Sequence, residues 1–304
     1  MSPNLRGALF MCIAMAGFTI NDTFVKWALE SLTLGQIILM RGMMAFVMLI
    51  LFFYRSIDLS QLPYLKHPAV ITRMVGEVGA TLCFLLSLSY LPIAFVTSIL
   101  QALPLLVTLG AAFFFSEPVG WRRWSAIIVG FIGILIIVRP GFEGFTVWSL
   151  VTVAAVIFCA IRDLATRVIP KEMSTANLST ATALVVALVG GALIEPFGGW
   201  QPVTTSNLAI VFTSAVALII GYYSLITAMR QGDISFMAPF RFTGLLWAIL
   251  LGYVIFGDLP DRYMLIGASI IICSGLYALY RERVVNRQRP ITESTSAGMA
   301  PDGL

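Results

Sequence analysis

The sequence has 304 residues, of which 59% are hydrophobic and only 11% are charged. A soluble domain usually carries about a quarter charged residues, so this composition excludes a protein whose surface mainly faces water. The net charge of +4 does not indicate a nucleic-acid-binding protein, because the basic residues are scattered between apolar runs and form no basic face.

Apolar segments separated by polar, proline or glycine residues predict ten transmembrane helices. Runs of about 18 apolar residues cross a hydrocarbon core roughly 30 Å thick, and such runs fill nearly the whole sequence. The predicted spans are residues 5–28, 34–54, 70–90, 93–115, 122–138, 145–167, 177–194, 207–229, 234–256 and 262–280. Very short connections, Tyr90-Leu91-Pro92 and Arg230-Gln231-Gly232-Asp233, predict two antiparallel helical hairpins. Residues 283–304 are too polar to bury a core, and we expect a disordered cytoplasmic tail there.

The lysine and arginine residues near the ends of these spans predict the orientation. Thirteen lie on one side, namely Arg6, Arg55, Lys66, Arg73, Arg122, Arg123, Arg167, Lys171, Arg230, Arg281, Arg283, Arg287 and Arg289. Three lie on the other side, namely Lys26, Arg139 and Arg262. Because basic residues accumulate in cytoplasmic loops, both termini are predicted to be cytoplasmic.

The two halves of the sequence are similar in an ungapped alignment that places residue 22 on residue 163. We call this the repeat alignment. The charged matches are Asp22 with Asp163, Lys26 with Arg167, and Glu117 with Asp258; the apolar matches are Phe95 with Phe236, Leu109 with Leu250, and Phe115 with Phe256. Five spans per half is an odd number, so the second half must cross the membrane in the inverted sense. We therefore predict a first repeat over residues 1–140 and an inverted second repeat over 141–282. Inverted repeats with a site near the membrane midplane recur in secondary transporters.

Several short motifs add to this pattern. They are Leu91-Pro92-Ile93-Ala94, Thr97, Pro104, Phe115-Ser116-Glu117-Pro118, Trp124, Gly130 and Gly133, and in the second half Gly232-Asp233-Ile234-Ser235, Pro239-Phe240-Arg241 and Phe256-Gly257-Asp258. In these motifs the sequence resembles the drug/metabolite transporter superfamily, and specifically its EamA-type members with two five-helix repeats. The resemblance covers roughly residues 5–280. It implies ten helices around a central cavity, transport of a small molecule by alternating access, and residence in the lipid bilayer of a bacterial inner membrane.

The resemblance leaves the substrate open, because family members move amino acids, nucleosides, vitamins or S-adenosylmethionine in either direction. The segments 1–7 and 161–167 are similar to those of a bacterial subgroup that includes riboflavin importers. We therefore expect a polar aromatic vitamin such as riboflavin. Import or export of amino acids or S-adenosylmethionine is the alternative.

Four charged residues are candidates for gating or coupling. Asp22 with Lys26, and Asp163 with Arg167, have the i,i+4 spacing that favours an ion pair on one helix. One interpretation is that each pair neutralises itself near the headgroups. The other is that the two pairs, which are equivalent in the repeats, act as gates at opposite membrane faces.

Glu77 is a candidate for coupling to a proton. It lies about two turns into the third span, where burial disfavours a charged carboxylate. The alternative is a salt bridge to Arg41 or Arg73. For Arg41 itself a role in helix packing or topology is favoured.

The remaining candidates would bind substrate. Arg241 lies inside the ninth span directly after Pro239 and Phe240, where a proline interrupts the backbone hydrogen bonds, and interrupted helices often form transporter sites. Its guanidinium suits a carboxylate, a phosphate or a ring carbonyl. Gln101, Tyr222, Tyr223 and Trp247 would add polar groups and ring faces, although membrane aromatics also pack or anchor at interfaces.

Other function classes have little support in the sequence. A nucleophile elbow, an HExxH helix and an aspartate cluster with metal spacing are all absent, and so is a Walker A motif. We expect no enzymatic activity, no cofactor, no metal and no nucleic-acid partner. The alternative from a different functional class is a non-transporting membrane scaffold.

Overall fold

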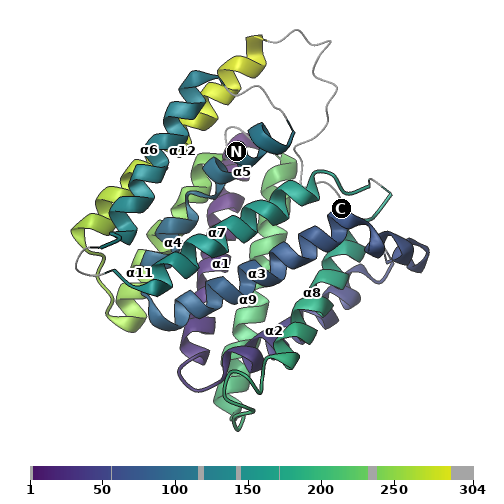
Figure 1. The fold of residues 1–304 in the computed structure, drawn as a ribbon. Helices are drawn as coiled ribbons and strands as arrows, with labels where there is room; N and C mark the ends of the chain where they lie inside the picture. Colours follow the sequence, from purple (N-terminus) through teal and green to yellow (C-terminus); the bar gives the residue numbers. More distant parts are fainter. Residues whose placement is uncertain are drawn as a thin grey trace.

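A computed structural model describes residues 3–55, 57–115, 120–141, 145–170, 172–231 and 238–288 (Figure 1). In these ranges the regular structure is entirely helical. The elements are α1 (Pro3–Ala28), α2 (Leu34–Phe53), η1 (Leu59–Lys66), α3 (Pro68–Tyr90), α4 (Ile93–Leu100), α5 (Leu103–Phe114), α6 (Trp121–Val138), α7 (Val147–Thr166), α8 (Thr175–Ala192), α9 (Thr205–Gln231), η2 (Ala238–Phe242), α11 (Thr243–Phe256) and α12 (Arg262–Gln288).

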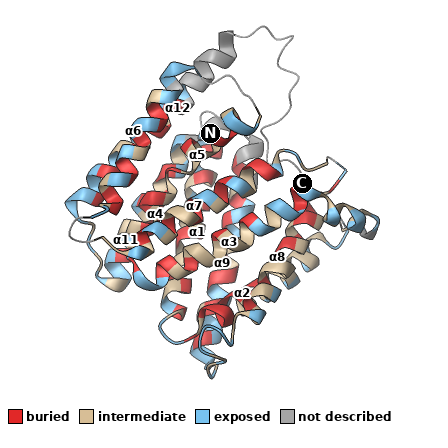
Figure 2. Ribbon diagram, viewed as in Figure 1, coloured by how far each residue is buried: buried red, intermediate tan, exposed pale blue. Residues whose placement is uncertain are grey.

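Many helices of the described residues are long and apolar enough to cross a membrane. Eight stretches satisfy this criterion, and two further apolar helices, Trp124–Val138 and Arg262–Ala278, are shorter. Exposed positions include large apolar side chains such as Leu51, Phe52 and Phe114, and exposed and buried positions alternate around most helices (Figure 2). Apolar outward faces suit contact with lipid, so the prediction of an all-α, multi-pass membrane protein is confirmed.

The packing of the helices follows the repeat. α1 packs along α9, α3 packs along α7, α6 packs on α12, and α2 packs on α8. The repeat alignment relates α1 to α7 and α3 to α9, so the α1–α9 and α3–α7 contacts are equivalent. It also relates α6 to α12 and α2 to α8, so each of these two pairs joins a helix to its own counterpart in the other repeat. In Figure 1, α6 and α12 lie at one flank and α2 and α8 at the other, with α1, α3, α7 and α9 between them.

Small residues let the central helices approach closely. A Cβ atom on Gly17 of α1 would lie 3.0 Å from the carbonyl oxygen of Ala217 on α9. A Cβ atom on Gly76 of α3 would lie 3.0 Å from the carbonyl oxygen of Phe158 on α7. The repeat alignment takes Gly17 to Phe158 and Gly76 to Ala217, so this is one contact made twice. It brings the polar residues of α1 and α3 against the opposite half.

The predicted fourth span is not one continuous helix. α4 ends at Leu100, and α5 begins at Leu103 with Pro104 in its first turn. Proline has no backbone N–H and clashes with the preceding turn, so it is accommodated where a helix starts. The ninth span is interrupted at the equivalent place, where the 3₁₀ helix η2 leads into α11. Its predicted beginning at residue 234 lies outside the described residues, as do Glu117, Phe236 and the Gly232-Asp233 connection.

One other expectation needs correction, and one connection contains an additional helix. α12 continues to Gln288, so the beginning of the predicted disordered tail, residues 283–288, is helical; residues 289–304 lie outside the described part. The connection between the second and third spans contains the short helix η1. Next to it, His67 caps α3, since its Nδ1 accepts a hydrogen bond from the Ala69 amide at 3.2 Å.

Candidate functional site

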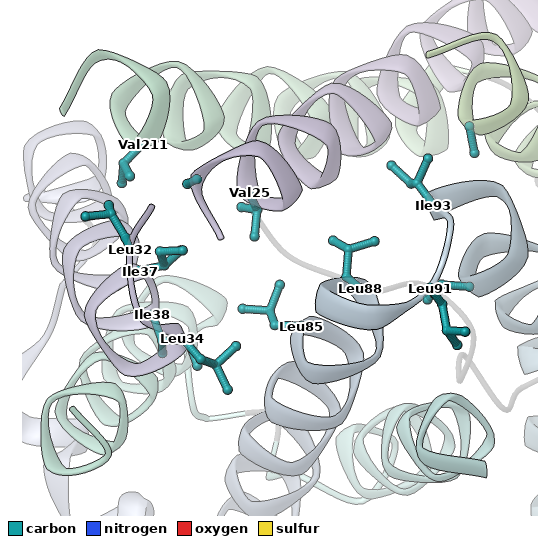
Figure 3. Packing of buried hydrophobic residues seen from close by; sticks show 13 residues of the cluster. Val25, Leu32, Leu34, Ile37, Ile38, Leu85, Leu88, Leu91, Ile93 and Val211 are labelled. Atoms are coloured by element: carbon teal, nitrogen blue, oxygen red, sulfur yellow. The ribbon is translucent and has the colours of Figure 1, made fainter. Parts of the chain in front are cut away.

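Apolar side chains close the bundle at the end where α1 finishes. Val25, Leu88 and Ile93 have 0% exposed surface, and they pack with residues of α2 and α9 (Figure 3). The opposite end has a smaller buried cluster of Val70, Met173 and Leu178. In the repeat alignment these three correspond to Val211, Leu32 and Ile37 of the first cluster. Among the described residues, therefore, the two clusters are related by the repeat, and the one at the end of α1 is the larger.

A lysine lies at the end with the larger cluster. Lys26 Nζ donates a hydrogen bond to the Leu91 carbonyl at 2.6 Å and lies 3.8 Å from Asp258 Oδ2. It also lies 5.1 Å from the centre of the Phe256 ring. Leu91 precedes α4 and Asp258 follows α11, so this contact, here named the Lys26 latch, ties α1 to two connections. The predicted pair of Lys26 with Asp22 is not the pair that forms.

The opposite end carries an equivalent contact. The Arg167 guanidinium lies over the Phe115 ring, 5.8 Å from its centre. Arg167 corresponds to Lys26 and Phe115 corresponds to Phe256. The counterpart of Asp258 is Glu117, which lies outside the described residues. Asp163, the predicted i,i+4 partner of Arg167, is bonded to Arg162, the residue directly before it.

Between the two ends, six charged side chains form what we call the charge network. They come from both repeats and carry charges of both signs: Asp22 on α1, Arg41 on α2, Glu77 on α3, Arg162 and Asp163 on α7, and Arg241 on η2. The network thus crosses from one repeat to the other.

The first part of the network is built around Asp22. Asn21 Nδ2 donates a hydrogen bond to Asp22 Oδ1 at 2.8 Å, and Arg41 Nη1 donates to Asn21 Oδ1 at 3.4 Å. The charge of Arg41 interacts with those of Asp22 and Glu77. Asn21 corresponds to Arg162 in the repeat, so in both halves an aspartate is held by the side chain that precedes it. The halves differ because that side chain is neutral in one and cationic in the other.

The second part is centred on Arg162. Its Nε donates to Asp163 Oδ1 at 2.8 Å, and its Nη1 lies 3.5 Å from Glu77 Oε1. The predicted partners of Glu77 were Arg41 and Arg73, both of the same half. The close approach of α3 and α7 at Gly76 explains why Arg162 comes nearer, since a Cβ on Gly76 would lie 2.9 Å from the Arg162 backbone nitrogen.

Arg73 binds neutral groups while remaining near the network. It donates to Thr166 Oγ1 at 3.1 Å and to Thr182 Oγ1 at 2.8 Å. Its charge still interacts with those of Glu77 and Asp163. The described residues around the network thus comprise the arginines at positions 41, 73, 162 and 241 and the acids at 22, 77 and 163.

Two side chains keep the network accessible. Arg241 is exposed, and it forms no hydrogen bond or ion pair within 4 Å with another described residue. Its charge interacts with those of Asp163 and Arg162. Tyr222 is 49% exposed, its ring meets Phe18 edge-on at 5.2 Å, and it interacts with the charges of Glu77 and Arg162. An accessible aromatic ring and an accessible guanidinium therefore both border the network.

The other sequence candidates lie around this region to different degrees. Gln101 Nε2 donates a hydrogen bond to the carbonyl oxygen of Phe242 at 3.3 Å. Phe242 is the residue that follows Arg241 in the sequence. Gln101 and Phe242 are themselves equivalent in the repeat alignment, so the repeat axis passes near this bond. Tyr223 is strongly exposed and Trp247 is half-buried, and neither is joined to the network by a contact between described residues.

Sequence reasoning missed Arg162 and Asp258. Arg162 had a signal, because a charged residue within a span costs a few kcal/mol unless it is paired or hydrated. Asp258 had a weaker one as the repeat counterpart of Glu117. Neither signal predicts which residue is contacted, since the partners Glu77 and Lys26 lie far away in the sequence.

Comparison with known proteins gives one family. The EamA-like transporter family matches residues 5–139 and again residues 146–280, two ranges that coincide in the repeat alignment. An S-adenosylmethionine uptake transporter of Rickettsia bellii is 31% identical over 64% of this chain and 67% of its own length. The corresponding transporter of Rickettsia prowazekii is 25% identical over 92% of this chain and 94% of its own. A riboflavin transporter of Vibrio cholerae is 28% identical over 89% and 91%.

A solved structure has the same fold. A crystal structure of a protein that is 16% identical in sequence superposes with a TM-score of 0.62 over 92% of this chain and 98% of its own. At this level of identity the similarity concerns the fold alone.

Proposed function

Because this chain belongs to the EamA-like transporter family, we propose that it carries a small organic metabolite across a bacterial inner membrane by alternating access. The charge network is the observation that supports this function most strongly. It places costly charges across the centre of a membrane protein, and it leaves Arg241 and Tyr222 accessible. The end that contains the Lys26 latch is closed by a fully buried apolar cluster, as one end of an alternating-access carrier must be.

Two substrates are suggested by the names of the relatives. S-adenosylmethionine is transported by one group and riboflavin by the other, and riboflavin is also the expectation from the sequence. Both molecules contain a flat heteroaromatic ring. The half-exposed ring of Tyr222 is suited to such a ring, since aromatic pairs stack or meet edge-to-face. Gln101, Tyr223 and Trp247 remain candidates for additional contacts.

The function is tested by uptake into liposomes that contain the purified protein. Labelled S-adenosylmethionine and labelled riboflavin would be offered separately, with and without an imposed pH gradient, and protein-free liposomes would be the control. We expect saturable, protein-dependent uptake of one of them. Acceleration by the gradient would support a coupled proton, for which Asp22 and Glu77 are the candidate carriers. Uptake of neither compound above the control would contradict the proposal.

We propose that the Lys26 latch and the Arg167–Phe115 contact are alternating gates. Each joins the end of a long helix to a connection in the same or the other repeat, and the two are equivalent in the repeats. Lys26 holds Asp258 and Leu91 together only while its end is closed. Asp22 and Asp163, four residues before the two cations, then report the state of each gate to the charge network.

Removing the latch is expected to shift the protein toward opening at that end. Asp258→Asn should raise the reactivity of a cysteine introduced at position 88, which is fully buried, toward a membrane-impermeant thiol reagent by about fivefold, or roughly 1 kcal/mol of a population shift. The four native cysteines would first be replaced by alanine. Ser269→Asn, on an exposed part of α12, is the matched control. Equal labelling of all three proteins would show that the latch does not hold this end closed.

We also propose that both termini are cytoplasmic, on the basis of the bias of thirteen basic residues to three. Fusions of a cytoplasmically fluorescent reporter to either terminus should both fluoresce. A fusion in the connection after α6, at Gly141, should be active only with a reporter that requires export. Opposite results for the two termini would contradict the ten-span orientation.

A further inference from the structure

Side-chain amides tie the helix pair α2 and α8, which lies at one flank of the bundle (Figure 1), at both of its ends. At one end Gln36, near the start of α2, donates a hydrogen bond from Nε2 to the Gln201 carbonyl oxygen at 2.9 Å. Its Oε1 accepts a second hydrogen bond from the Gln201 backbone N–H at 3.1 Å. Gln36 has 0% exposed surface. Gln201 lies in the connection that follows α8, so this contact binds the start of α2 to the chain that leaves its partner helix.

The other end of the pair has the equivalent contact. Asn177, near the start of α8, donates from Nδ2 to the Asp58 carbonyl oxygen at 2.6 Å, and its Oδ1 accepts from the Asp58 backbone N–H at 3.1 Å. Asp58 lies in the connection that follows α2. The repeat alignment places Gln36 on Asn177, and it places Asp58 two positions before Gln201. Each repeat thus contributes one amide that forms two hydrogen bonds with the backbone of the other repeat, and we call these two contacts the amide clasps.

Between the clasps the two helices touch through their backbones. A Cβ atom on Gly190 of α8 would lie 2.7 Å from the backbone nitrogen of Leu39 on α2. A Cβ atom on Gly42 of α2 would lie 2.8 Å from the Cβ of Ala187 on α8. Helix α8 also has no charged residue. Close-packed surfaces of this kind transmit displacement and are not easily compressed or parted, so we expect the two helices to move together.

The contacts that this pair makes with the central helices are different, because they are not repeated. α2 packs on α9 and α8 packs on α3, which are equivalent positions in the two repeats. The polar contacts nevertheless differ. Arg41 on α2 donates to Asn21 on α1 at 3.4 Å. Thr182, which is the repeat counterpart of Arg41, instead accepts from Arg73 on α3 at 2.8 Å.

The symmetry of the repeats connects this difference to movement. Alternating access in a carrier of inverted repeats moves one bundle of helices against another and exchanges the conformations of the two repeats. A contact that both repeats already make in the same way is retained in that exchange. We propose that α2 and α8, held by the amide clasps, form a rigid unit that stays together throughout the transport cycle, while the central helices α1, α3, α7 and α9 move against it. The inference rests on the proposed transport function and adds which interface stays closed.

The first test links α2 covalently to α8. Cysteines would replace Gly42 and Ala187 in a protein whose four native cysteines are alanines. A disulfide joins Cβ atoms about 3.5–4.5 Å apart, so a small separation of the helices is enough for it to form. Oxidation should leave the initial rate of uptake into liposomes unchanged. If this pair prevents folding, Leu39→Cys with Gly191→Cys would be linked by a short bifunctional thiol reagent, because a Cβ on Gly191 lies 3.6 Å from Leu39 Cδ1, an ordinary contact.

The matched control is a link at the end that contains the Lys26 latch. Ile93→Cys with Gly252→Cys joins α4 to α11, since a Cβ on Gly252 would lie 3.1 Å from Ile93 Cγ2. Oxidation of this pair should stop uptake, and a reducing agent should restore it, because the latch end must open during transport. Loss of uptake when α2 is linked to α8, restored by the reducing agent, would overturn the inference.

The second test removes one clasp and measures thermal unfolding in detergent. Gln36→Met keeps the length of the side chain but loses both hydrogen bonds, and should lower the unfolding temperature by about 5 °C. Gln201→Met is the control, because the backbone of Gln201 forms the clasp while its side chain bonds to the Gly198 carbonyl oxygen. The disulfide between positions 42 and 187 should restore most of the loss.

An equal decrease for Gln36→Met and Gln201→Met, or no decrease for either, would overturn the role of the clasp. An inactive wild type would overturn the transport function, whereas the unfolding measurements would still decide whether the clasps hold α2 and α8 together.

Discussion

Replacement of Arg241 by alanine is expected to lower the initial rate of metabolite uptake at least 100-fold without lowering the amount of protein in the membrane. Arg241 is exposed beside the charge network and has no direct ion pair with a described residue. Its removal therefore breaks few internal contacts, while the ligand loses charged hydrogen bonds of about 1.5–3 kcal/mol each. Arg241→Lys keeps the charge but not the planar fork, and should weaken substrate affinity about tenfold, or roughly 1.4 kcal/mol.

The readouts are uptake into liposomes and the yield of monodisperse protein from the membrane. Arg262→Ala is the control, since it removes an exposed arginine at a helix start away from the network. Normal uptake by Arg241→Ala would show that Arg241 does not bind substrate. A loss of folded protein would assign it a structural role instead.

Replacement of Arg162 by alanine is expected to lower stability as well as transport. Arg162 lies within 4 Å of Glu77 and Asp163 together, so its loss leaves two carboxylates without their nearest cation. Removing one member of a buried ion pair costs about 3–5 kcal/mol. These side chains are between one fifth and about one third exposed, which places the expected loss at the lower end of that range. The thermal unfolding temperature in detergent should fall clearly, and uptake should cease.

The triple variant Arg162→Leu, Glu77→Gln, Asp163→Asn distinguishes stability from function. It removes the charges together, so most of the lost unfolding temperature should return, because replacing a whole buried ion set by neutral groups is often neutral or stabilising. Uptake should remain absent. If Arg162→Ala unfolds at the wild-type temperature, the arginine does not compensate the two acids.

Most of the fold was predictable because the membrane imposes it. Apolar runs of sufficient length must form spanning helices, and the predicted second span, 34–54, differs from α2 by one residue at its end. The repeat alignment was visible because charges are scarce inside spans, so that a match such as Asp22 with Asp163 does not follow from apolar composition. The break between α4 and α5 was missed because Pro104 begins a new helix there, and hydropathy does not distinguish one broken helix from a continuous one.

Several members of the charge network could be singled out from the sequence one by one, but Arg162 was missed and the pairs were not predictable. Asp22, Glu77 and Arg241 stood out because charge within a membrane requires an explanation. Their partners did not, because the i,i+4 rule considers one helix alone. The structure pairs Lys26 with Asp258 and Glu77 with Arg162, and each partner comes from the other repeat. Only the packing of α1, α3, α7 and the connections around them decides such pairs.

Counterflow in liposomes tests the proposed carrier most directly. Vesicles containing the protein would be loaded with millimolar unlabelled S-adenosylmethionine and diluted into a trace of the labelled compound. An alternating-access carrier returns with labelled substrate each time it releases an unlabelled molecule, so label should accumulate transiently above its equilibrium level. Arg241→Ala vesicles should show no such overshoot. Label that enters wild-type vesicles only up to equilibrium, at a rate unaffected by the internal load, would contradict transport by alternating access.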